Sequence, residues 1–288
     1  MTRSSLPIHQ SPPVVNPHAA QPTSFLALIK SFWCNRQLIL QMTKREVVGR
    51  YKGSAMGLAW SFFNPVFMLM VYTFVFSVIF KSRWGGEDSK TQFAVVLFAG
   101  MLVNNLFSEV LNRAPGLILS NVNYVKKVVF PLETLPFISM GAALFHAVIS
   151  LVVLVMAFFV FNGYVQWTAV FLPLVILPLI VMTLGIAWIL ASIGVFLRDV
   201  GQTIGIITTV MMFLAPVFYP ITAIPEDIRP WLMLNPLTLI IEQTREVLIW
   251  GNLPSWSSLG IYSLVAVVVA WVGYAWFQKT RKGFADVL

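Results

Sequence analysis

The sequence predicts an all-α, polytopic membrane protein, and its composition, its long apolar runs and its charge distribution each point to that class. Of its 288 residues, 58% are hydrophobic and only 10% are charged. A soluble globular domain has about 25% charged residues, so lipid must solvate much of this chain. We expect one membrane domain with six transmembrane helices, an N-terminal interfacial amphipathic helix and short re-entrant helices on the outer side.

The N-terminal part of the chain divides into a polar tail and an amphipathic segment. Residues 1–22 are rich in proline and polar residues and lack the apolar core of a signal peptide, so we expect a disordered cytoplasmic tail. Between residues 24 and 48, apolar side chains such as Phe25, Leu28 and Phe32 are interrupted by lysine and arginine. This pattern predicts a helix that lies in the membrane interface.

A spanning helix requires roughly 20 mostly apolar residues, and six segments of the chain qualify. The fourth is long enough to tilt or to extend past the membrane. The predicted spans are residues 57–80, 93–110, 136–161, 167–197, 203–218 and 258–277.

Two connecting segments are predicted not to span. Residues 112–136 form an inner loop with prolines near both ends. Residues 221–251 are apolar but contain three prolines and several charged residues. Prolines remove backbone donors and suit short helices that enter and leave the membrane, so we expect two such helices with a break near Asn235–Pro236.

Lysine and arginine lie mainly on one side of the predicted spans. If the N-terminus is inside, five of the 19 fall in outer segments, namely Lys81, Arg83, Lys90, Arg229 and Arg245. The other lysines and arginines lie in inner segments, and this excess of positive charge predicts that both termini are cytoplasmic.

The chain offers little chemistry of its own. Cys34 is the only cysteine, which excludes an intramolecular disulfide and a cysteine-based metal site. The sequence contains no HExxH, GxxxxGK[ST] or GxGxxG, so we expect no catalytic, cofactor-binding or metal-binding residues. The predicted spans contain few ionisable side chains, among them Glu109 and His146. For His146 we expect a hydrogen-bonded packing role.

This scarcity of ionisable groups disfavours an ion-driven transporter and a membrane-embedded enzyme. It leaves a channel, or a passage for which a partner protein supplies the energy. The loop 112–136 is suited to docking a soluble partner. An ordinary solvated loop with positive-inside charge fits its pattern equally well.

Three stretches resemble the ABC-2 family of ABC-transporter permeases, and most of all the branch that exports O-antigen, capsule or teichoic-acid polysaccharides. They are "REVVGRYKGSAMGLAWSFFNP", "SNVNYVKKVVFPLETLP" and "RDVGQTIGIITTVMMFLAPVFYPITAIPEDIRPWLMLNPLTLIIEQTREVLIWG". The resemblance covers nearly the whole chain after the tail. It implies a homodimer in the bacterial inner membrane that works with two copies of a separate ABC ATPase, which binds the ATP and Mg²⁺.

The same resemblance implies the cargo and the roles of individual segments. The cargo would be a polyprenyl-pyrophosphate-linked polysaccharide, with O-antigen preferred and capsule or teichoic acid as alternatives; nucleic acid is not expected as a partner, and membrane lipids are. Residues 121–136 would contain a coupling helix, 24–48 would also touch the ATPase, and 221–251 would form outer gate helices. The expected coupling residues are Asn121, Asn123, Tyr124, Val125, Lys126 and Lys127.

Cations beside the first span are candidates for binding the pyrophosphate head group. They are Arg45, Arg50 and Lys52. Arginine binds phosphate oxygens through a planar fork, whereas lysine acts as a point charge. The alternative is that these residues only set topology and attract anionic lipids.

Glycines recur every fourth residue between these cations and the span, at Gly49, Gly53 and Gly57. Gly201 and Gly205 repeat the spacing. Such a pattern either lets helices approach closely or eases turns at the interface.

Aromatic side chains are candidates for lining a sugar channel, because sugar C–H faces stack on aromatic rings. Trp60, Phe63 and Phe67 share one helix face at i, i+3 and i+7, and we add Tyr219 to this set. The alternative is ordinary helix packing.

Two other functions remain open. An ABC-2 exporter of small lipophilic drugs would share the fold, and the partner ATPase and neighbouring glycosyltransferase genes would distinguish it. A membrane scaffold or enzyme would keep its function when every ATPase is lost.

Overall fold

A computed structural model describes residues 22–79, 90–126 and 130–288 of the chain. All regular elements in these ranges are helices. Five are long and apolar enough to cross a membrane, namely Gly57–Phe76, Phe93–Gly116, Leu132–Asn162, Trp167–Phe196 and Trp256–Val287. The predicted class, a polytopic α-helical membrane protein, is therefore confirmed. Of the expected tail, residues 1–22, only Pro22 is among the described residues.

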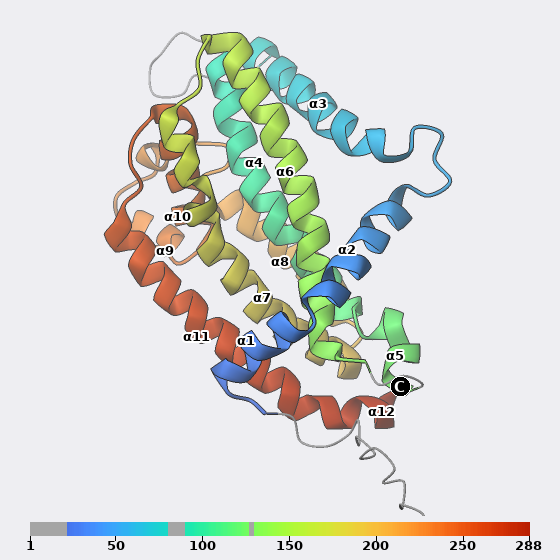
Figure 1. The fold of residues 1–288 in the computed structure, drawn as a ribbon. Helices are drawn as coiled ribbons and strands as arrows, with labels where there is room; N and C mark the ends of the chain where they lie inside the picture. The colour runs from blue at the N-terminus through green and yellow to red at the C-terminus, as the bar shows by residue number, and fades with distance from the viewer. Residues whose placement is uncertain (1–21, 80–89, 127–129) are drawn as a thin grey trace, which may run out of the picture.

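Two helices occupy the segment for which we expected one amphipathic helix. Ser24 caps α1 (Phe25–Cys34), and its hydroxyl accepts a hydrogen bond from the Ala27 amide. α2 (Arg36–Tyr51) begins after Asn35, whose side-chain amide donates to the Ser31 carbonyl at 2.8 Å. In Figure 1, α1 and α2 lie along one side of the bundle, and α2 crosses α6.

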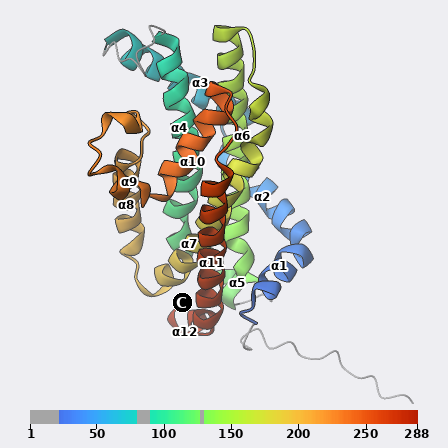
Figure 2. The same cartoon turned by 90° about the vertical axis from the view of Figure 1, so that its left-hand side faces the viewer.

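α4 is the central helix of the bundle. Every residue from Phe93 to Phe98 is buried, as expected for a helix that is apolar all round. It packs against α3, α6, α7, α8 and α10, and Figures 1 and 2 show it inside the others. The bounds are α3 Trp60–Tyr72, α4 Lys90–Arg113, α6 Leu135–Asn162, α7 Leu172–Phe196, α8 Val200–Leu214 and α10 Pro236–Arg245.

α7 and α11 (Trp256–Thr280) pack backbone against backbone. A Cβ at Gly185 would lie 2.6 Å from the Val269 carbonyl oxygen, and one at Gly273 would overlap the Gly185 carbonyl. These two glycines are the small residues that let the helices approach.

The glycines that we singled out from the sequence do not serve this purpose within the protomer. Apart from the adjoining backbone of the same chain segment, no described atom lies within 4 Å of a Cβ built at Gly49, Gly53, Gly57, Gly201 or Gly205. Gly53 and Gly57 instead have backbone φ values of 88° and 52°, which residues other than glycine rarely adopt. They form the turn between α2 and α3.

The helix of the fifth predicted span starts three residues before and ends four residues before the predicted bounds, 203–218. α8 has 15 residues, about 22 Å at 1.5 Å per residue, against a hydrocarbon core of about 30 Å. It ends at Leu214 because Ala215 precedes Pro216, and a residue before proline is disfavoured in the helical region. Ala215 is accordingly extended, with φ −85° and ψ 153°.

Short helices follow α8 on the way to α11. α9 (Arg229–Met233) and α10 are separated at Asn235, whose side chain accepts from the Leu237 amide and donates to the Met211 carbonyl. Figure 2 shows α8 and α9 at one side of the bundle and α10 nearer its middle, where α10 packs on α4 and α7.

The remaining elements are short. α5 (Val122–Lys126) and α12 (Phe284–Val287) pack together at the end of the molecule that holds the C-terminus (Figure 1), here called the α5 end. The 3₁₀ turns are Gly57–Ala59, Ala114–Gly116, Leu119–Asn121, Leu132–Thr134, Trp167–Phe171, Ile221–Ala223 and Arg281–Gly283, and π-helical turns cover Thr73–Ile79 and Glu246–Trp250.

Candidate functional site

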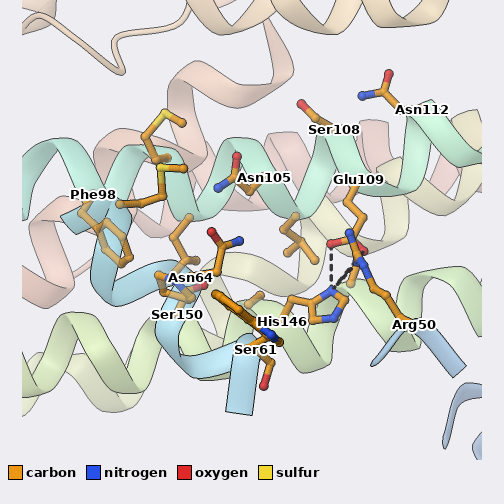
Figure 3. A pocket seen from close by; sticks show the side chains of 18 of the residues that line it. Arg50, Ser61, Asn64, Phe98, Asn105, Ser108, Glu109, Asn112, His146 and Ser150 are labelled. Carbon is orange, nitrogen blue, oxygen red and sulfur yellow. Dashed lines mark hydrogen bonds and ion pairs between the residues drawn. The ribbon is translucent and has the colours of Figure 1, made fainter. Parts of the chain in front are cut away.

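A cavity of about 640 Å³ lies between α2, α3, α4 and α6. Figure 3 shows its polar side chains, which come from all four helices. The cavity has a charged end at Arg50 and Glu109, and polar side chains continue from there along α3, α4 and α6. Its polar lining residues are Arg50, Tyr51, Ser61, Asn64, Asn105, Ser108, Glu109, Asn112, Arg113, His146 and Ser150.

The charged end is a network that joins three helices. The Arg50 Nη1 atom lies 2.6 Å from Glu109 Oε1, and His146 Nδ1 lies 3.0 Å from both Glu109 oxygens (Figure 3). The Tyr51 hydroxyl and His146 Nε2 share a hydrogen bond of 3.3 Å. Burial raises the pKa of Tyr51, so its hydroxyl stays protonated and can donate this bond. His146 is hydrogen-bonded, as expected, and its role in helix packing stays a prediction.

Arg113 extends the network toward α2. It forms an ion pair with Glu46 and lies 3.8 Å from Glu109. The two arginines are therefore matched by two glutamates, and the cluster carries no net charge when His146 is neutral. Such a balanced cluster is not a strong site for a multiply charged anion.

The three candidate head-group cations do not converge. Arg45 donates to the Tyr124 hydroxyl at 2.8 Å, whereas Arg50 contacts Glu109. Lys52 is exposed just past the end of α2, and its side chain makes no hydrogen bond to any residue that the structure describes. Arg50 remains half exposed, so its other nitrogens stay accessible.

The four candidate channel aromatics also separate. Trp60 lines the cavity, whereas Phe63 and Phe67 do not and are exposed on a neighbouring face of α3. Phe63 and Phe67 contact each other, with ring centroids 6.5 Å apart. The Tyr219 hydroxyl donates to the Phe213 carbonyl beyond the end of α8, away from this cavity.

The candidate coupling residues lie together at the α5 end. Tyr124 stacks on Phe130 with centroids 4.4 Å apart, and Val125 is half-buried beside it. Asn123 and Lys126 are exposed, and the Asn121 side chain donates to the Leu117 carbonyl. Lys127 lies outside the described residues.

Two features of the structure were missed by sequence reasoning. Arg245, expected in an outer segment, is buried and donates to the carbonyls of Val96, Pro216 and Val217 and to Glu242. Asn64 and Asn105 face the cavity. The available signal was an asparagine within each apolar span. No group of three metal-ligating side chains occurs among the described residues.

Comparisons with known proteins agree on one family. The sequence profile of the family described as ABC-2 type transporter matches residues 37–249. The O-antigen export system permease protein RfbA of Myxococcus xanthus is 27% identical, over 91% of this chain and 99% of that protein. An RfbA of Klebsiella pneumoniae is 24% identical, over 87% of this chain and 95% of that protein. The polysialic acid transport protein KpsM of Escherichia coli is 24% identical, over 83% of this chain and 91% of that protein.

Proposed function

Because the chain belongs to the ABC-2 type transporter family, we propose that it is the permease subunit of an ATP-driven exporter of a lipid-linked polysaccharide, with O-antigen as the preferred cargo. The observation that carries this proposal is the near full-length similarity to proteins named for O-antigen export. A capsular polysaccharide is the alternative cargo, which the similarity to KpsM supports.

The proposed complex contains two copies of this chain and two copies of a separate ABC ATPase. The ATPase would bind ATP and Mg²⁺ and would dock at the α5 end, where Asn123 and Lys126 are exposed. Both termini would be cytoplasmic, in the bacterial inner membrane, as the excess of inner lysine and arginine suggests. The segments α1–α2 and α9–α10 would act as interfacial and outer gate elements.

The head group of the cargo would reach the protein beside α2. Lys52 supports this part of the proposal, because it is an exposed cation with no ion pair among the described residues. Arg50 is already neutralised by Glu109 and would offer the head group only the donors of its remaining nitrogens. Arg45 would contribute only after releasing Tyr124. Arg50→Lys keeps the charge but removes the planar fork, so it should slow export, and Arg50→Gln should slow it further.

Deletion and complementation in the source bacterium test the function. Loss of this chain should remove the surface polysaccharide while its lipid-linked form accumulates inside the cell. The intact chain should restore export only when the partner ATPase can hydrolyse ATP. Normal surface polysaccharide together with altered drug sensitivity would instead favour a drug exporter.

Nucleotide binding by the purified chain provides a second test. The isolated chain should bind no ATP, and the complex with the ATPase should hydrolyse it. Specific ATP binding by this chain alone would contradict the proposed division of labour.

A further inference from the structure

The side chains of two asparagines on membrane-spanning helices are unpaired within residues 22–79, 90–126 and 130–288. Asn64 on α3 and Asn105 on α4 are exposed, and neither side chain makes a hydrogen bond to any residue that the structure describes. Figure 3 shows both amide groups in the space between α3 and α4. An amide without a partner is costly in hydrocarbon, so this space must hold something polar.

The cavity wall presents hydrogen-bonding groups beside aromatic surfaces. Each carboxamide offers two hydrogen-bond donors and an acceptor. The hydroxyls of Ser61, Ser108 and Ser150 can each donate and accept as well. Trp60 and Tyr72 on α3 line the same cavity. This combination suits a polyhydroxylated molecule with apolar C–H faces.

The charges of the cavity argue for an uncharged ligand. Glu109 neutralises Arg50, and Glu46 neutralises Arg113. A diphosphate would need uncompensated cations, whereas sugar hydroxyls need neutral donors and acceptors. The volume of about 640 Å³ lies within the range of small-molecule sites, about 300–1,000 Å³.

We propose that this cavity is a carbohydrate-binding subsite that holds one or a few uncharged sugar units of the cargo, with Asn64 and Asn105 as hydrogen-bonding residues and Trp60 as a stacking surface. The subsite rests on the proposed export function. It differs from the head-group site beside α2 in the chemistry that it recognises.

Photo-crosslinking in living cells tests the occupant directly. Benzoylphenylalanine is placed at Asn64 or Asn105, and at Val148 as a control, because Val148 is exposed on α6 but does not line the cavity. A third site, Phe67, lies on α3 one turn from Asn64 and outside the cavity. Adducts that carry the cell's surface polysaccharide should form at Asn64 and Asn105 and not at Val148.

The outcomes separate the subsite from the function. Carbohydrate adducts at Phe67 but not at Asn64 or Asn105 would overturn the subsite and leave the export function standing. Adducts at the two asparagines only with phospholipid, or only with a second copy of the chain, would also overturn it. Unchanged surface polysaccharide in cells that lack the chain would overturn the export function itself.

Small substitutions guard against a bulky probe that disturbs folding. The double variant Asn64→Ala with Asn105→Ala should slow export about tenfold, because each net hydrogen bond is worth a few-fold in binding. Asn162→Ala is the matched control, since its side chain bonds the Phe158 carbonyl at the end of α6, outside the cavity. Export at the parental rate by the correctly inserted double variant would overturn the subsite.

Discussion

Glu109 connects α4 to two other helices through a single carboxylate. It contacts Arg50 on α2 and His146 on α6, and its side chain is only 19% exposed. A carboxylate that loses its cation in such a place is left without compensation, and so is an arginine that loses its carboxylate. The pair therefore holds the turn between α2 and α3 against the bundle.

A double-mutant cycle measures this connection. Glu109→Gln and Arg50→Gln should each lower thermal stability, and together they should lose less than the sum, with a coupling of about 0.5–1 kcal/mol, because Arg50 is half exposed. The pair Glu226 and Arg229 is the control, since it is 3.7 Å apart and Glu226 is 88% exposed. Additive effects at Glu109 and Arg50 would contradict the connection.

The glycines at the α7–α11 contact support a second prediction at this scale. Gly273→Ala should destabilise the protein by about 1–3 kcal/mol, because its Cβ would overlap the Gly185 carbonyl and the backbones would have to separate. Gly260→Ala on the same helix meets nothing within 4 Å and should be neutral or slightly stabilising. Melting temperatures of the purified variants decide the matter, and equal values for the two would contradict the close packing.

Among the elements, α8 depends on a side chain from outside itself. The chain after α8 is not helical, so the carbonyls of Pro216 and Val217 lack helical partners. Arg245 on α10 donates to both, at 2.6 and 3.0 Å, and also to Val96 on α4. A Cβ at Gly100 would lie 2.9 Å from its guanidinium, so the glycine leaves room for this side chain. Arg245 thereby fastens the end of α8 to α4 and α10.

Removal of this guanidinium should loosen all three elements. Arg245→Met leaves three carbonyls and Glu242 without their donor, so we expect a loss of about 3 kcal/mol or more. Arg229→Met is the control, because Arg229 also donates to two carbonyls but is partly exposed. Thermal unfolding in detergent measures both, and a smaller loss at Arg245 than at Arg229 would contradict this role.

The sequence predicts the helices better than it predicts the tertiary contacts between them. The apolar runs locate the long helices, because lipid enforces them over some 20 residues each. The early end of α8 was readable from Pro216, since it follows from a local steric rule. The pairing of Arg50 with Glu109 was not, because 59 residues separate them and their approach depends on how α2 crosses the bundle. The same holds for Gly185 and Gly273, whose contact is fixed only by helix packing.

Across the whole molecule, the α5 end is tied to distant parts of the chain through Glu133. Its carboxylate accepts from Ser31 on α1 at 3.1 Å and pairs with Arg281 after α11 at 2.7 Å. Its carbonyl accepts from the Trp188 indole on α7 at 3.1 Å. Tyr124 on α5 stacks on Phe130, and the Phe130 carbonyl accepts a hydrogen bond from Arg281, so α5 contacts the same network.

If α5 docks the ATPase, exposed residues on it should couple hydrolysis to export. Tyr124 and Val125 are poor probes, because a charge there would also break the packing on Phe130. Lys126→Glu reverses an exposed charge and should leave the stability of this chain within about 0.5 kcal/mol of the parent. We expect it to reduce export severalfold and to lower ATP hydrolysis stimulated by the cargo in reconstituted vesicles.

Lys282→Glu is the control, since Lys282 is exposed at the same end but lies outside α5. If Lys126→Glu exports at the parental rate from an intact complex, or if Lys282→Glu is equally impaired, α5 has no specific part in coupling.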